Sequence, residues 1–484
     1  MTLLDTFARF NRVYNNSPHL HISSQHVLEK HAADIQEWLD VTQSLQYLSS
    51  KERIMAEDLF EAAFTSARSL FLMGDEITAW VGLQHISFAS DQTIPGIYAA
   101  QSLAMSARFG IYQYLLDEAE ESLATMLRHF KETDHPQAAQ YWELKGMILS
   151  LRKQWKDAIP YFQRAREHIE QSSMTELKRW IKSSRNDLMG HQNLRIVDCL
   201  IYYGWSVDGK ERSSIIREIH AHLTTAASLL RSPMLLYLKS LNEVELLLLM
   251  GNLPMAKKQI DMLLDSHNVE SRKTSILHPA AYVMKARVAD LEGDQTAMIS
   301  YLSRALAEST IMFPDVMQEL QVVDYAFSLI RDNVMSRTQW QPLLEAMVLM
   351  LEAKDWYTGR NHSKSVAQTT EKLWKNWQSN DPDHSVQTDP PMLEDLYWAG
   401  YLHDIGKLLL PRSLLNKIAP LGDWEWKIIR RHPVYSHNML MSLGTERIAT
   451  WAGEHHQNAS GYGYPGTQPA SEFGLCIAVA DILE

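Results

Sequence analysis

Five histidines and two aspartates near the end of the chain constrain most strongly what this sequence can fold into. They lie in separate segments whose apolar residues mostly recur at three- and four-residue spacing, which is typical of helices. Imidazole nitrogens and carboxylate oxygens are ligands for divalent metals, so a fold that gathers these segments would surround a binuclear centre. The seven residues are His362, His403, Asp404, His432, His455, His456 and Asp481.

The adjacent pair His403 and Asp404 stands at the end of an apolar segment. On its own, this pair also fits a capped helix end with a surface carboxylate. Together with the other histidines, it offers a nitrogen and an oxygen to one metal, and its carboxylate can bridge to a second. Two metals held in this way lower the pKa of a water molecule and polarise phosphoryl oxygens. The cluster therefore predicts hydrolysis of a phosphate ester.

The chain before this cluster is organised differently. The whole chain has 484 residues, more than the roughly 250 to 300 at which one hydrophobic core stops growing, so more than one structural unit is expected. Most of the part before the cluster has an almost continuous helical pattern. The segment 141–165 matches the offsets of tetratricopeptide repeats, in which small residues let paired helices approach closely and an aromatic fills a groove. The matching residues are Trp142, Gly146, Ala158, Phe162 and Ala165.

Weaker echoes of this repeat extend on both sides. Alanines after short turns recur at intervals of about 40 residues, with one longer gap that could hold two diverged repeats. We therefore expect a tetratricopeptide-like array at 51–310 that senses or binds a partner. An N-terminal helical segment at 1–50 would precede it, and a connecting helix at 311–340 would follow. An ordinary helical bundle is the alternative. The alanines are Ala79, Ala119, Ala158, Ala256 and Ala297.

Charge and cysteine content argue against several other classes of protein. A net charge of −12 disfavours a surface that coats DNA, so any nucleotide site must be built locally. Two distant cysteines, Cys199 and Cys476, give neither a disulfide framework nor a zinc-thiolate site. The N-terminus lacks a signal-peptide pattern, and no apolar run approaches the roughly 20 residues that span a bilayer. We expect a cytoplasmic protein without a membrane span, of unknown oligomeric state.

Short motifs around the cluster follow one another in a characteristic order. They are DWYT from Asp355, HDIGK from His403, the segment 411–421, His432-Pro433, the pair His455-His456, and Gly463-Tyr464-Pro465. In order and spacing, residues 341–484 resemble the HD-GYP subgroup of the HD superfamily of metal-dependent phosphohydrolases.

This resemblance implies an all-helical bundle that binds two divalent metal ions, iron or manganese, and hydrolyses cyclic di-GMP in bacterial second-messenger signalling. All seven histidines and aspartates would be metal ligands, with Asp404 as the bridge. Asp404 and Lys407 would act in catalysis, and the Lys407 ammonium would neutralise the scissile phosphate. A loop beside the site would handle the substrate or contact GGDEF-type diguanylate cyclases, and it comprises Gly461, Gly463, Tyr464 and Pro465.

The sequence also departs from the family pattern. After His456 it reads QNAS, without the family's glutamate, arginine and aspartate, and Ser436 replaces a glycine. Thr358 stands at the offset of a glutamate that holds a third metal, so we expect two metals. The sequence ends three residues after Asp481, so we expect a domain that is short at its C-terminus relative to the family.

These departures keep two alternatives in place. One is a catalytically degenerate HD-GYP module that binds a protein partner or a nucleotide. The other is a scaffold in which the repeat array is the main functional part, since such arrays bind peptides along a concave face. The tryptophans near the cluster, among them Trp426, are interpreted as packing residues outside the site.

Overall fold

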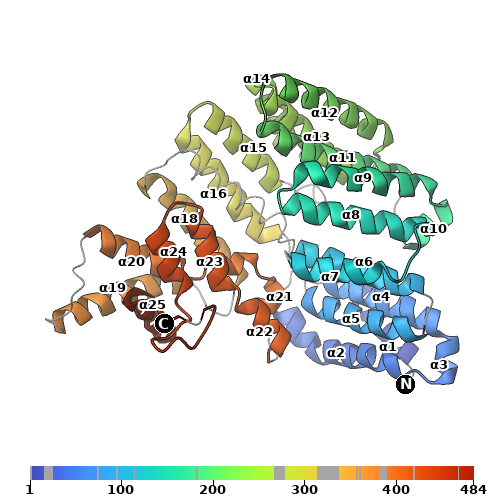
Figure 1. Cartoon of the computed structure of the whole chain (residues 1–484), viewed down its shortest axis with the longest axis horizontal. Helices are drawn as coiled ribbons and strands as arrows, with labels where there is room; N and C mark the ends of the chain where they lie inside the picture. Colours follow the sequence, from blue (N-terminus) through green and yellow to red (C-terminus); the bar gives the residue numbers. More distant parts are fainter. Residues whose placement is uncertain are drawn as a thin grey trace. The chain divides into compact units, whose positions relative to one another are not determined.

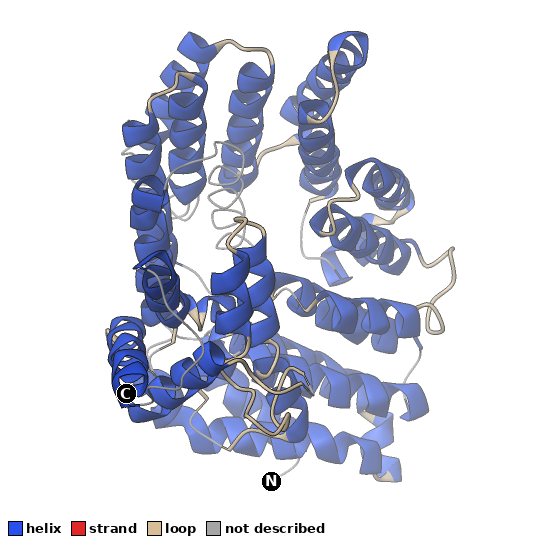
Figure 2. Cartoon of the chain, turned by 60° about the vertical axis from the view of Figure 1, so that its left-hand side comes forward, coloured by secondary structure: helices blue, strands red, loops and turns tan. Residues whose placement is uncertain are grey.

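A computed structural model of the chain describes residues 3–15, 25–72, 76–93, 96–113, 115–180, 184–265, 278–312, 337–355, 358, 361–380, 390–417, 420–466 and 468–484. Within these residues every regular element is a helix (Figure 2), which confirms the predicted all-α fold. Most of the expected connecting helix, at 313–336, lies outside the described residues. The chain forms two compact units, Met1–Asp294 and Gln295–Glu484.

The first unit is built largely from helices paired with their neighbours along the chain (Figure 1). One pair consists of α8 (His135–Leu151) and α9 (Trp155–Gln171). Gly146 of α8 lies against the ring of Phe162 in α9, and a Cβ on Gly146 would come within 2.8 Å of Phe162 Cε1. The absent side chain is therefore what allows these two helices to approach closely.

The recurring alanines also lie at helix contacts. Ala79, Ala119, Ala158 and Ala256 are fully buried, whereas Ala297 is half-buried. Buried small residues suit closely paired helices. The assignment to tetratricopeptide repeats itself stays a prediction.

The long gap between Ala158 and Ala256 contains one full helix pair rather than two repeats. α11 (Arg185–Trp205) and α12 (Gly209–Leu229) have 21 residues each, and the short α10 (Met174–Trp180) precedes them. The two long helices and α10 take up the extra length of the gap.

The other helices of the first unit extend this arrangement in both directions. Phe7, Trp38 and Phe60 belong to a common core near the N-terminus. The elements are α1 (Leu3–Asn15), α2 (Gln25–Ser44), η1 (Leu45–Tyr47), α3 (Ser50–Ile54), α4 (Ala56–Leu72), α5 (Glu76–Thr93), α6 (Gly96–Tyr112), α7 (Leu116–Met126), α13 (Pro233–Leu249), α14 (Leu253–Asp265) and α15 (His278–Leu291).

The second unit begins with α16 (Gln295–Met312) and α18 (Arg337–Lys354), which pack on each other. Residues 295–310 are expected in the array from the sequence, whereas α16 belongs to the second unit in the structure. The domain limits drawn from the sequence stay predictions.

The remaining helices of the second unit form a bundle in which α20 contacts α19, α24 and α25, and α23 contacts α24 and η3. Several of these helices begin or end at the same place, and that place is the candidate site described below. None of the described helices is long and apolar enough to cross a membrane. The elements are α19 (His362–Asn380), α20 (Pro390–Leu402), η3 (Ile405–Leu409), α21 (Arg412–Leu415), α22 (Asp423–Ile429), α23 (His432–Met441), α24 (Glu446–Gly453) and α25 (Glu472–Leu483).

Candidate metal centre

The structure brings all seven predicted ligands together in the second unit. Most of them stand at helix ends, where the backbone changes direction and side chains from different helices can meet. His362 is the first residue of α19, and His432 is the first residue of α23. The others are His403 and Asp404 just after α20, His455 and His456 after α24, and Asp481 in the last turn of α25.

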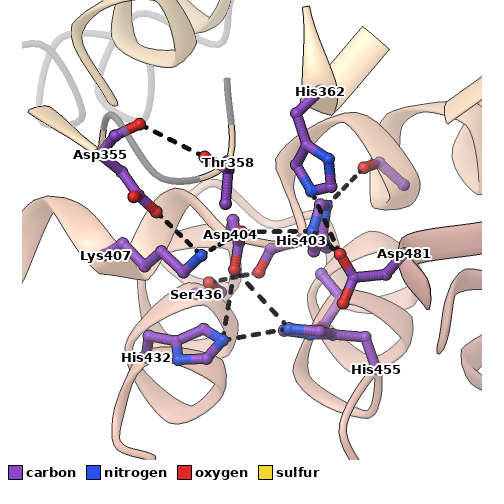
Figure 3. A network of polar contacts seen from close by, with 12 residues as sticks. Asp355, Thr358, His362, His403, Asp404, Lys407, His432, Ser436, His455 and Asp481 are labelled. Atoms are coloured by element: carbon purple, nitrogen blue, oxygen red, sulfur yellow. Dashed lines mark hydrogen bonds and ion pairs between the residues drawn. The ribbon is translucent and has the colours of Figure 1, made fainter. Parts of the chain in front are cut away.

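Asp404 lies at the centre of this cluster (Figure 3). Its Oδ1 is 3.3 Å from Nε2 of His432 and 3.8 Å from Nε2 of His455. Its Oδ2 is 3.4 Å from Nε2 of His403. Because the two oxygens face different histidines, Asp404 has the geometry of a carboxylate that bridges two cations.

Asp481 supplies the second carboxylate. Its Oδ1 is 3.1 Å from Nε2 of His362 and 3.4 Å from Nε2 of His403. Oδ1 of Asp404 lies near His432 and His455, whose Nε2 atoms are 3.1 Å apart. Asp404 therefore contacts His403 through one oxygen and this second pair of histidines through the other.

Three overlapping groups within this cluster could each hold a metal ion, since the ligand atoms of each group lie within 4.8 Å of one another. Nε2 of His403 is buried and lies 3.4 Å from Oδ2 of Asp404 and from Oδ1 of Asp481, without a well-aligned hydrogen bond to either. A buried polar atom without a good hydrogen bond is costly, and a cation bound between these groups would satisfy it. The residues present therefore fit divalent metals. The groups are His432, His455 and His456; His362, His403 and Asp404; and His403, His455 and Asp481.

Backbone carbonyls orient three of the imidazole rings. Each ring places its Nδ1 within hydrogen-bonding distance of the carbonyl oxygen three residues earlier: His403 at 2.8 Å, His432 at 2.7 Å and His455 at 2.5 Å. If Nδ1 of His432 and of His455 donates its hydrogen to that carbonyl, the Nε2 lone pair of each of these two rings points into the cluster. Metal-bound histidines are commonly oriented by such a second hydrogen bond.

Burial and the carboxylates shift the histidine pKa values in opposite directions. Burial lowers the pKa of His432 to about 3 and holds that of His455 well below its usual range. At His403 burial also acts to lower the pKa, but Asp404 and Asp481 outweigh it and raise the pKa to about 10. His432 and His455 are therefore neutral at pH 7, which is the form of imidazole that binds a metal.

Lys407 lies between two carboxylates at the edge of the cluster. Its Nζ is 2.7 Å from Oδ2 of Asp404 and 3.0 Å from Oδ2 of Asp355, which directly follows α18. Burial acts to lower the pKa of Lys407, but the two carboxylates outweigh it and raise the pKa above its usual range. Lys407 is therefore charged at neutral pH. The sequence gives no role to Asp355 beyond its place as the first residue of the DWYT motif.

Ser436 ties the His-Asp turn to α23. Its hydroxyl donates to the carbonyl of His403 at 2.7 Å and accepts from the amide of Gly406 at 2.9 Å. Gly406 also has no room for a side chain, because a Cβ would lie 2.2 Å from the carbonyl oxygen of His432. The serine that departs from the family pattern thus makes two buried hydrogen bonds that hold His403 and Asp404 in place.

Replacing Ser436 by alanine is expected to loosen this turn, because the variant leaves a buried amide and a buried carbonyl without their partner. The cost should be about 1–3 kcal/mol in the local opening free energy. Hydrogen exchange of the peptide that contains Gly406, measured in the full chain, checks this result. Ser442→Ala is the control, since Ser442 is exposed and follows the C-terminal end of the same helix. Equal protection of Gly406 in the two variants would show that Ser436 does not hold the turn.

The predicted loop beside the cluster is closed by Asn458, one of the residues that departs from the family pattern. Oδ1 of Asn458 accepts from the amides of Ser460 at 3.1 Å and Tyr462 at 2.9 Å. Gly461 has a φ of 78° and Gly463 a φ of 129°, in the left-handed region that favours glycine. The QNAS segment therefore contains its own support for the loop.

Tyr464 connects this loop to the histidines. Its ring stacks on that of His456 with the centroids 4.6 Å apart, and a cis peptide bond joins it to Pro465. Burial raises the pKa of Tyr464 to about 12, so its hydroxyl stays protonated at neutral pH.

Thr358, which stands at the third-metal position, instead donates to the carbonyl of Asp355 at 3.4 Å.

Comparison with protein families places this cluster in a known class of site. Residues 365–475 match the family model described as HD domain. The match includes five of the seven candidate ligands, and His362 and Asp481 lie just outside it. An HD domain implies binding of divalent metal, in agreement with the groups of side chains described above.

Individual relatives are phosphodiesterases of cyclic dinucleotides. The chain is 32% identical over 142 residues to the 3'3'-cGAMP-specific phosphodiesterase 1 of Vibrio cholerae. This aligned region covers 28% of this chain and 31% of that protein. It is 31% identical over 205 residues to a cyclic di-GMP phosphodiesterase of Pseudomonas aeruginosa, with 41% and 47% covered. A cyclic di-GMP phosphodiesterase of Thermotoga maritima is 28% identical over 149 residues, with 29% and 37% covered. The chain thus spans less than half of the length of each relative.

One solved structure, a circular tandem repeat protein with a novel repeat topology, aligns with 99% of this chain and 95% of its own length. Its TM-score is 0.14 and its identity 13%, so this alignment supports no inference about the repeats.

Proposed function

We propose that this chain is a metal-dependent phosphodiesterase that hydrolyses a cyclic dinucleotide, with cyclic di-GMP as the first candidate substrate. The observation that carries the proposal is the convergence of buried Nε2 atoms of His403, His432 and His455 on the carboxylate of Asp404. Relatives named for cyclic di-GMP and for 3'3'-cGAMP support the same substrate class. Since those two ligands share their phosphodiester chemistry, the cluster does not favour one over the other.

The seven candidate ligands would hold two divalent cations, and we propose iron or manganese. When bound, such cations acidify water and withdraw charge from phosphoryl oxygens. Asp404 would keep the two halves of the site together, because each of its oxygens faces a different histidine. Lys407, charged and held by two carboxylates, would place its ammonium beside the scissile phosphate and stabilise the charge that develops there.

The loop with Gly461, Gly463, Tyr464 and Pro465 would form the rim on which the substrate rests, because Tyr464 packs on the ligand His456. We also propose that the helical pairs of the first unit regulate the site by binding a partner protein, for which a GGDEF-type diguanylate cyclase is a candidate. Adding such a cyclase to the full chain and measuring hydrolysis tests that regulation directly.

A comparison of substrates tests the proposal as a whole. Full-length protein loaded with iron or manganese is expected to linearise cyclic di-GMP or 3'3'-cGAMP, and the rates on the two identify the preferred ligand. Loss of turnover after chelation, with recovery on adding metal back, is expected as well. Binding of either ligand by metal-loaded protein without any turnover would favour the alternative, a degenerate module that binds nucleotide or partner.

A further inference from the structure

Arg430 is an exposed arginine at the edge of the candidate metal centre, two residues before His432. It directly follows α22, and its backbone amide donates to the carbonyl of Trp426 at 3.0 Å. Its guanidinium carbon lies 5.6 Å from the ring centroid of Trp426 and 5.4 Å from that of Tyr464. Two aromatic rings therefore hold this cation, and one of them is the ring that stacks on His456.

The hydrogen-bonding groups of this guanidinium are free within the described part of the chain. Other arginines of the second unit have partners: Arg447 pairs with Asp395 at 2.6 Å, and Arg412 donates to the carbonyl of Ala353 at 2.9 Å. Among the described residues, none pairs with or accepts from the Arg430 side chain. A guanidinium packed between rings with open N–H groups suits a planar, bidentate anionic ligand such as a phosphate.

The exposure of Trp426 is a second observation that favours a ligand-binding surface at this edge of the metal centre. It is 42% exposed, although a tryptophan that only packs would be expected to bury more of its ring. Its neighbour Arg430 orders it by a cation–π contact. The two side chains and Tyr464 thus form an aromatic and cationic rim along one side of the metal cluster.

A cyclic dinucleotide carries two phosphodiester groups on one ring, and only one of them can be at the metals during a given cleavage. We infer that Arg430 binds the second, uncleaved phosphate of the cyclic dinucleotide and so selects substrates that carry two linked phosphodiesters. This inference rests on the proposed function. It gives a role to the Arg430 guanidinium, which lies next to the site but outside the cluster of candidate ligands.

The test compares two substrates in the full-length, metal-loaded protein: cyclic di-GMP, with two phosphodiesters, and bis(p-nitrophenyl) phosphate, with one. Arg430→Gln should lower kcat/KM for cyclic di-GMP about tenfold more than for the single diester, which corresponds to the loss of a hydrogen bond to a charged group. The fall in kcat/KM should come from a higher KM, with kcat little changed. Arg430→Lys should recover part of it, because the charge is kept while the planar fork is lost.

Two further readouts separate this role from a structural one. Lys427→Gln, the same charge change at an exposed residue of the same helix, should leave the ratio of the two substrates as in the natural chain. Raising the ionic strength should weaken cyclic di-GMP binding in the natural chain more than in Arg430→Gln, because an exposed ion pair is screened by salt. Equal losses on both substrates, or an unchanged ratio, would overturn the inference.

Failure of the proposed function would give a different pattern. If the natural chain hydrolyses neither substrate, the dissociation constant for cyclic di-GMP decides, measured by calorimetry on the metal-loaded protein. Weaker binding by Arg430→Gln than by Lys427→Gln supports the phosphate contact even without catalysis. The same dissociation constant in both variants, or no binding by the natural chain, overturns it.

Discussion

Replacing Asp404 by asparagine is expected to remove metal binding and to lower the hydrolysis rate by more than about 100-fold, the upper end of what losing a partner outside the ligand set costs. The reason is the position of its carboxylate, which faces His403 with one oxygen and His432 with the other. An amide offers one neutral oxygen, so it cannot bridge two cations with a shared negative charge. Metal content by elemental analysis, beside turnover of cyclic di-GMP, measures both effects.

Asp423→Asn is the control for this variant, because Asp423 is exposed in the first turn of α22 and outside the cluster. It should keep the metal content and the rate of the natural chain. Full metal content in Asp404→Asn would contradict the bridging role, whereas a folded variant that loses metal and turnover together supports it. Circular dichroism of the two variants establishes that the helices remain.

The second large effect is expected for Lys407→Met, which keeps an unbranched side chain only one heavy atom shorter and removes its charge. The rate constant kcat should fall roughly 100- to 1,000-fold, as when one donor to a developing oxyanion is removed. Metal content should stay near that of the natural chain, because Lys407 is a cation and not a ligand. Single-turnover measurements at saturating substrate separate this loss from weaker binding.

Asp355 makes the lysine test sharper. Asp355→Asn keeps the charge of Lys407 but weakens one of its two contacts, so kcat should fall less than in Lys407→Met. Lys407→Arg keeps the charge and changes the geometry, which should give an intermediate rate. If Lys407→Met loses metal and activity to the same extent as Asp404→Asn, the lysine supports the structure of the site rather than the reacting phosphate.

The all-α fold class could be predicted from the sequence, because the helical spacing of apolar residues is a local pattern that can be recognised in each segment separately. The pairing of α8 with α9 could also be anticipated from Gly146 and Phe162, since a small residue opposite an aromatic permits close approach. The length of α11 and α12 could not, because spacing between alanines does not reveal how many residues one helix uses. The domain limits drawn from the sequence stay predictions. The expected array extends to residue 310, whereas α16 packs on α18 within the second unit.

At the candidate site, the sequence indicated which side chains meet but not what orients them. The seven candidate ligands could be chosen from their residue types and from the order of the motifs that resemble the family. The carbonyls beside Nδ1 of His403 and of His432 could not be predicted, because every residue has a backbone carbonyl and only the fold decides which one a ring meets. Ser436 was noted only as a departure from a pattern, and its two hydrogen bonds become visible once α23 lies against η3. The contact of Arg430 with Trp426 has the i,i+4 spacing of a helix and could be anticipated, whereas its contact with Tyr464, which lies in a distant loop, could not.

The most direct test of the account is to measure metal content and cyclic di-GMP turnover together on full-length protein purified without oxygen. About two metal ions per chain are expected, as in two-metal phosphodiester hydrolysis. Turnover is expected with them, and it should disappear in the double variant His403→Ala/Asp404→Ala. A folded chain that binds no metal and hydrolyses no cyclic dinucleotide would contradict the account and leave a binding module in its place.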